Sequence, residues 1–152
     1  MNILITGSNG QLGKDCELVF SDSHQTTCID IEDLDITAPD QVDDIVKTIK
    51  PDIIINCEAF TQVDACETQK ETAENVNANG AENIAKSARK YNALCIHIST
   101  DYIFDGNKKI TESYVETGIP SPLSIYGRTK LSGERSVMNN AGKHIIPRTA
   151  WL

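Results

Sequence analysis

A tyrosine and a lysine four residues apart, Tyr126 and Lys130, are the two residues whose chemistry this sequence suggests first. On a helix this spacing places both side chains on one face. A lysine ammonium beside a phenol favours the phenolate, so we expect the pKa of Tyr126 to fall toward neutral pH. Such a phenol can pass a proton to or from a substrate oxygen. Thr100 follows an apolar segment and can hydrogen-bond the same oxygen, so these three residues are the predicted catalytic groups.

The chain opens with a short apolar run followed at once by Gly7, Gly10 and Gly13. A buried strand, a glycine-rich turn and a helix form the start of a dinucleotide-binding βαβ unit. The glycines permit a sharp turn and close approach to a pyrophosphate, which meets the free N–H groups of the helix. The spacing is GxxGxxG rather than GxGxxG, so the motif depends on its context. We predict that this turn binds a nicotinamide cofactor, which supplies a hydride to the carbonyl held by the catalytic residues.

Asp30 ends the second predicted strand, about twenty residues after the glycines, where an acidic residue commonly accepts hydrogen bonds from the adenosine ribose. Further carboxylates follow it, and no arginine is nearby to hold a 2′-phosphate. The cofactor is therefore NADPH or NADH, and Asp30 favours NADH. A solvated acidic loop is the alternative interpretation.

Apolar periodicity predicts alternating strands and helices that position these residues. We expect strands at 2–6, 26–29, 53–55, 93–98 and 143–148, helices at 10–20, 39–50, 70–91 and 126–139, and loops at 56–67 and 102–124. The alternation predicts an α/β fold, a Rossmann-type doubly wound parallel sheet in three αβα layers. Ligands then bind at the carboxyl edge of the sheet, where the residues after 56 and Thr100 lie.

Composition narrows the class of protein. The 152 residues predict one domain, and a net charge of −8 argues against nucleic-acid or anionic-membrane partners. No apolar stretch is long enough to span a bilayer, and the N-terminus is not a signal peptide. The five cysteines contain no CxxC pair and the three histidines are scattered, which predicts reduced thiols, a cytoplasmic location and no metal site.

Several segments resemble the dTDP-4-dehydrorhamnose reductase family of extended short-chain dehydrogenase/reductases. They are TGSNGQLG at 6–13, LDIT at 34–37, PDIIIN at 51–56, TQVDACE at 61–67, STDYIFDG at 99–106, SPLSIYGRTKLSGE at 121–134 and RTAWL at 148–152. The resemblance covers the whole chain. It implies NAD(P)H-dependent reduction of the C4 ketone of dTDP-4-dehydro-6-deoxy-L-mannose, a dTDP-linked 4-keto-6-deoxy sugar, to dTDP-L-rhamnose.

The resemblance also implies roles for individual residues. Tyr126 is the proton donor, Lys130 tunes it and holds the nicotinamide ribose, and Thr100 polarises the ketone. The residues that match cofactor contacts of the family are Gly10, Gln11, Leu12, Asp30, Asp35, Ile36, Ala59, Phe60 and Thr61. Asp101 and Trp151 match contacts on the substrate side, and Val63 is a further match.

Three features depart from the family. Cys57 and Glu58 stand where two alanines are usual, and the Glu58 carboxylate either repels the pyrophosphate, points into solvent or pairs with a cation. Pro147 precedes Arg148 in a strand that is usually uninterrupted. The family's C-terminal substrate-binding part does not follow Leu152, so residues 1–152 are expected to form the NAD(P)-binding domain alone, with an exposed last strand, poor turnover and a tendency to self-associate.

Two other interpretations stay open. One is a reductase or epimerase of another nucleotide sugar. The other is a non-catalytic nucleotide-binding subunit, since a regulatory subunit of methionine adenosyltransferase shares this fold. The presence of all three predicted catalytic residues favours an enzyme.

Overall fold

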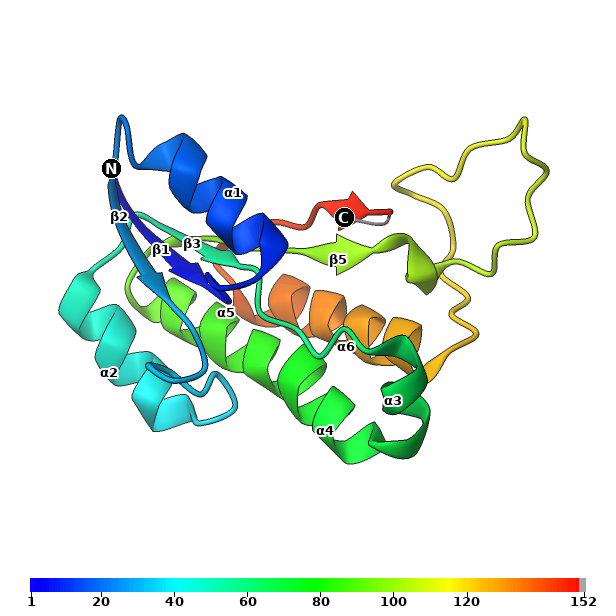
Figure 1. Ribbon diagram of the computed structural model, residues 1–152, viewed down its shortest axis with the longest axis horizontal. Helices are drawn as coiled ribbons and strands as arrows, with labels where there is room; N and C mark the ends of the chain where they lie inside the picture. Colours follow the sequence, from blue (N-terminus) through cyan, green and yellow to red (C-terminus); the bar gives the residue numbers. More distant parts are fainter. Residues whose placement is uncertain (151–152) are drawn as a thin grey trace.

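The computed structural model describes residues 1–150, which form a parallel β-sheet with helices on both faces (Figure 1). The main sheet has the strand order β2-β1-β3-β4-β6, and every neighbouring pair is parallel. Its strands are β1 Asn2–Thr6, β2 Gln25–Ile29, β3 Ile53–Asn56, β4 Leu94–His97 and β6 Lys143–Ile145. This confirms the predicted α/β fold, a doubly wound parallel sheet in three layers.

The helices divide between the two faces of the sheet. They are α1 Gln11–Phe20, α2 Pro39–Ile49, α3 Val63–Thr68, α4 Lys70–Glu74, the π-helix η1 Asn75–Gly80, α5 Ala81–Lys90, the 3₁₀-helix η2 Asp101–Ile103 and α6 Ile125–Asn140. Helix α1 covers one face, and α2, α5 and α6 cover the other (Figure 1). Within residues 1–150, no helix is both long and apolar enough to cross a membrane.

The alternating side chains of β1 supply the two halves of the core. Ile3 and Ile5 pack under α1, whereas Leu4 packs against α2 and α5, and all three are at most 1% exposed. Strands covered on both faces are apolar throughout for this reason. Helix α5 contributes alanines to this core, and their small size lets the helix lie close to the sheet.

Three predicted elements differ from the structure. The predicted loop 56–67 contains most of the short helix α3, which is anchored by the buried side chain of Cys66. The predicted helix 70–91 is continuous but contains η1, in which Gly80 packs on Ile36. A Cβ on Gly80 would lie 2.6 Å from Ile36 Cδ1, so a larger residue here would require the buried Ile36 side chain to shift.

The last predicted strand, 143–148, is split into β6 and a second short strand, β7 Arg148–Thr149. Pro147 has no N–H to donate to a ladder, and its carbonyl oxygen accepts a hydrogen bond from Ser99 N at 2.8 Å. Strand β7 then pairs with β5, Ser99–Thr100, as a separate two-stranded parallel sheet. The split therefore gives Thr100 a strand partner of its own, while β6 lies at the edge of the main sheet with all its residues exposed.

Helix α6 lies against η1 at Gly133. A Cβ at this position would lie 2.2 Å from the backbone oxygen of Asn77. Neither backbone can yield without moving a helix, so we expect Gly133→Ala to destabilise the protein by about 1–3 kcal/mol. Urea denaturation followed by circular dichroism measures this change.

Gly142→Ala is the matched control, because the nearest atom to its added Cβ is Arg89 Cγ at 3.6 Å, an ordinary contact. We expect its stability to stay within about 0.5 kcal/mol of the wild type. Equal losses in the two variants would contradict the close packing of α6 on η1.

Candidate active site

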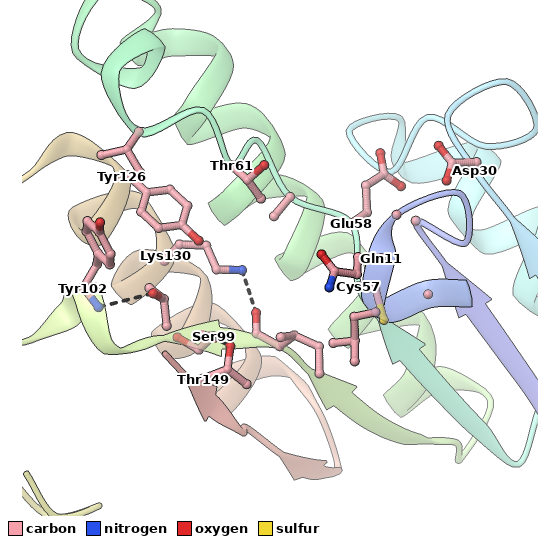
Figure 2. A pocket seen from close by; sticks show the side chains of 18 residues that line it. Gln11, Asp30, Cys57, Glu58, Thr61, Ser99, Tyr102, Tyr126, Lys130 and Thr149 are labelled. Carbon is pink, nitrogen blue, oxygen red and sulfur yellow. Dashed lines mark hydrogen bonds between the residues drawn. The ribbon is translucent and has the colours of Figure 1, made fainter. Parts of the chain in front are cut away.

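A cavity of about 540 Å³ opens at the carboxyl ends of β1 and β3. The chain leaves β1 toward β2 on one side and leaves β3 toward β4 on the other, and such a switch point is where open α/β sheets bind ligands. The predicted site residues that line it are Gly7, Gly10, Gln11, Leu12, Gly13, Asp30, Ala59, Thr61, Val63, Thr100, Tyr126 and Lys130. The structure thus brings the glycine turn and the predicted catalytic residues to one cavity (Figure 2).

The glycine turn is shaped by close backbone contacts. Gly7 has φ +67°, and a Cβ on it would lie 2.7 Å from Glu58 N. A Cβ on Gly13 would lie 2.3 Å from the oxygen of Gly7. No side chain caps the start of α1 at Gly10, so the N–H groups of its first turn are available to a bound anion. This cradle fits the pyrophosphate of a dinucleotide.

Asp30 is fixed against this turn. Its Oδ2 accepts a hydrogen bond from Asn9 N at 2.7 Å, and its Oδ1 accepts one from Ile31 N at 2.9 Å. Three predicted cofactor residues, Asp35, Ile36 and Phe60, lie outside the cavity lining. Asp35 accepts from the backbone and hydroxyl of Thr37, and Ile36 is buried beneath η1. Asp35 and Ile36 therefore organise the turn after β2 rather than face the cavity.

Phe60, another predicted cofactor residue, is held from behind by Asn77. Phe60 N donates to Asn77 Oδ1 at 2.8 Å, and Asn77 Nδ2 donates to Phe60 O and to Thr129 Oγ1, each at 3.1 Å. One buried amide therefore joins the loop after β3 to helix α6. Sequence reasoning missed Asn77, although a polar residue four positions from both Ala73 and Ala81 on an apolar face was a usable signal.

The predicted catalytic residues converge from two elements. Lys130 is 3% exposed, and its Nζ donates to Ile98 O at 2.6 Å. The ring of Tyr126 extends into the cavity from the same helix (Figure 2) and packs edge-on against Tyr102, with 5.5 Å between ring centroids. Thr100 Oγ1 accepts from Tyr102 N at 3.2 Å and donates to Asp101 Oδ1 at 3.2 Å. All three predicted catalytic side chains thus lie around one end of the cavity.

Burial sets the protonation of this end of the cavity. It lowers the pKa of Lys130 from 10.5 to about 8, and the Glu134 carboxylate acts in the opposite direction. Burial also raises the pKa of Tyr126, while the hydroxyl of Thr100 acts against that shift. The prediction that the pKa of Tyr126 falls was therefore wrong for this structure, because desolvation of the phenol outweighs the groups that favour the phenolate. Tyr126 is a protonated phenol at neutral pH.

A buried carboxylate fixes the elements beneath this end of the cavity. Glu134 is 1% exposed and accepts from Ser99 Oγ at 2.6 Å and from two nitrogens of Arg148, Nε at 2.9 Å and Nη2 at 2.8 Å. It thereby joins β5, α6 and β7. Sequence reasoning missed this role, although Glu134 lies one helical turn after Lys130 and so on the same face.

Asp101, predicted to lie on the substrate side, is not among the residues that line this cavity. Asp101 lines a neighbouring hollow of about 610 Å³ together with Arg148. Trp151 lies outside the described residues. Within residues 1–150, His, Cys, Asp and Glu side chains form no group of three or more that could hold a metal ion.

Proteins of known sequence and structure are similar to this chain along its length. A dTDP-4-dehydrorhamnose reductase from Aggregatibacter actinomycetemcomitans is 40% identical over 151 residues, which make up 98% of this chain and 51% of that protein. A crystal structure of a dTDP-4-dehydrorhamnose reductase from Clostridium acetobutylicum superposes with a TM-score of 0.95 at 43% identity and covers 99% of this chain and 54% of that one. A dTDP-4-dehydrorhamnose reductase from Bacillus anthracis, solved in complex with NADP, superposes with a TM-score of 0.95 at 40% identity. The match covers 99% of this chain and 53% of that one.

The chain spans about half the length of the curated relatives it matches. The family described as the RmlD substrate binding domain matches residues 1–152, the whole sequence. These matches confirm the resemblance that the motifs indicated. The chain therefore belongs to the RmlD substrate binding domain family.

Proposed function

We propose that this chain is the NAD(P)-binding domain of a reductase that converts the C4 ketone of a dTDP-linked 4-keto-6-deoxy sugar into an alcohol, giving dTDP-L-rhamnose. The observation that carries the proposal is the single cavity lined by the glycine turn and by Thr100, Tyr126 and Lys130. The names of the curated relatives and the NADP complex of the Bacillus anthracis protein support the same reaction.

The cofactor lies across the cavity in this proposal. The glycine turn and the start of α1 bind its pyrophosphate, and Asp30 accepts hydrogen bonds from the adenosine ribose. The loop of residues 59–61, held by Asn77, forms one wall, and Lys130 binds the nicotinamide ribose. A bound nicotinamide supplies the hydride for the ketone carbon.

The protein's own groups handle the ketone oxygen. The hydroxyl of Thr100 turns from Asp101 Oδ1 to the ketone oxygen, and it and the hydroxyl of Tyr126 donate hydrogen bonds there, which stabilises the negative charge that develops. Tyr126 then gives its proton to this oxygen, and its raised pKa keeps that proton in place until the charge has developed. The ammonium group of Lys130 stabilises the phenolate that is left behind.

The substrate is a small anionic sugar nucleotide in this proposal, and Asp101, Val63 and Trp151 contact its sugar. A net charge of −8 supports a small-molecule partner rather than nucleic acid or an anionic membrane. All five cysteines are free thiols, which supports a reducing compartment such as the cytoplasm.

The direct test titrates the purified chain with NADH and NADPH, follows nicotinamide fluorescence, and then adds the dTDP-4-keto sugar. Binding followed by oxidation of the nicotinamide supports the reductase. Binding without oxidation of the nicotinamide supports a nucleotide-binding role that needs more than these residues for catalysis. Failure to bind either cofactor would exclude the proposal.

Tyr126→Phe removes the proposed proton donor while keeping the ring. We expect ketone reduction to fall by about 10²–10⁴-fold, because general acid catalysis supplies an effect of that size. The Kd for NADH and NADPH should change little, because the ring still fills its place. Steady-state nicotinamide absorbance and fluorescence titration measure the two effects. Tyr91→Phe is the control, because the hydroxyl of Tyr91 donates to Asp43 and Tyr91 does not line the cavity. This variant should keep full activity.

The pKa of Lys130 predicts the alkaline limb of the pH profile. Its ammonium form dominates below about pH 8 and is lost as the pH rises through that value, so kcat/KM should fall there. The measurement uses the pH dependence of kcat/KM, because this ratio reports the ionisations of the free enzyme, to which the pKa of Lys130 refers. Lys130→Arg keeps the charge at higher pH and should remove this limb from whatever activity survives. An unchanged limb in this variant would assign it to another group.

A further inference from the structure

Glu58 lines the same cavity but has no part in the proton transfer proposed above. Its backbone is fixed directly on the glycine turn, because a Cβ on Gly7 would lie 2.7 Å from Glu58 N and 2.8 Å from Glu58 Cα. Glu58 N also donates to Asn56 Oδ1 at 3.2 Å, and Asn56 Oδ1 accepts from Thr6 Oγ1 at 2.8 Å. The residue therefore has a set position beside the part of the cavity that fits a pyrophosphate.

The carboxylate of Glu58 extends toward that of Asp30 at one end of the cavity (Figure 2). Its Oε2 is buried and has no hydrogen-bond partner among the described residues. Both oxygens of Asp30 already accept a backbone hydrogen bond. Buried polar atoms in native proteins are normally paired, so the unpaired oxygen of Glu58 indicates that a donor from a ligand completes this site.

Charge further restricts what this ligand group is. Among the described residues that line the cavity, Lys130 is the only cation, and it lies at the other end (Figure 2). Ribose hydroxyls are neutral donors that suit two carboxylates. A 2′-phosphate carries about −1.5 to −2 charges near neutral pH and calls for Arg or Lys partners.

We propose that Glu58 acts with Asp30 as a specificity determinant for the cofactor. The two carboxylates accept hydrogen bonds from the free hydroxyls of the adenosine ribose and thereby select NADH over NADPH. The inference rests on the proposed function, since it requires a dinucleotide on the glycine turn.

The selection depends on pH. Burial, followed by the charges of Asp30 and Asp35, raises the pKa of Glu58 to about 7. The neighbouring side chains of Cys57 and Gln11 add no charge that would change the pKa of Glu58. The Cys57 thiol, with a pKa of about 12, is neutral, and Gln11 of α1 carries no charge. Below pH 7 Glu58 is mainly a neutral carboxyl that tolerates a 2′-phosphate better, and above pH 7 it is a carboxylate that repels one. The preference for NADH therefore grows as the pH rises.

The test measures Kd for NADH and for NADPH by nicotinamide fluorescence at pH 6 and pH 8. We expect the wild type to prefer NADH, with a larger preference at pH 8. In Glu58→Gln the preference at pH 8 should shrink roughly fivefold or more, because one charge facing the phosphate is removed. The phosphate of NADPH titrates in the same range, and the pH dependence that persists in Glu58→Gln measures that contribution.

Glu32→Gln is the matched control, because it removes an equal charge two residues from Asp30 on an exposed loop outside the cavity lining. Its ratio of the two Kd values should equal that of the wild type. An unchanged ratio in Glu58→Gln, an equal shift in Glu32→Gln, or a wild type that prefers NADPH would each overturn the inference while leaving the proposed function intact. Binding of neither cofactor would overturn both. Glu58→Ala, with its fold checked by circular dichroism, replaces Glu58→Gln if the latter does not fold.

Discussion

The side-chain amide of Asn77 joins the two halves of the cavity, and the geometry of the site depends on it. On one side it pairs with both backbone groups of Phe60, as a neighbouring strand would, and on the other it bonds Thr129 of the helix that carries Tyr126 and Lys130. Gly133 allows α6 to lie directly on the backbone of the same asparagine. Because buried amides are costly to leave unpaired, this connection fixes the distance between the loop after β3 and the predicted catalytic residues of α6.

The cavity is lined by one cation, Lys130, and by the carboxyl groups of Glu58 and Asp30, and burial favours the neutral forms of Lys130 and Glu58. Folding favours neutral Glu58, whose pKa rises from 4.5 to about 7, so the stability this gives is present below pH 4.5 and is lost as the pH rises through 7. Folding also favours neutral Lys130, whose pKa falls from 10.5 to about 8, so that stability is present above pH 10.5 and is lost as the pH falls through 8. Both contributions are absent between about pH 7 and 8, where both groups are mainly charged, as the proposed roles require.

Strong apolar periodicity and glycine spacing made the main strands, the principal helices and the grouping of Thr100 with Tyr126 and Lys130 predictable from the sequence. Parallel strands place their carboxyl ends together whatever the details of the loops, so this part of the site follows from topology. The rise in the pKa of Tyr126 was not predictable, because desolvation depends on the complete surroundings of the phenol. Asn77 and Glu134 were missed because each acts through partners distant in the sequence, and the split at Pro147 appears only when Ser99 is placed beside it.

The π-helix η1 shows how a buried polar group can stand within a continuous helix. A π turn closes its hydrogen bond over one more residue than an α turn, and such turns within α-helices occur often at functional sites. The segments on either side, α4 and α5, are α-helical, and the chain runs from one to the other through η1 without a break. Asn77 lies in this wider turn, so an amide that pairs with two other segments of the chain is held by a helix that continues past it.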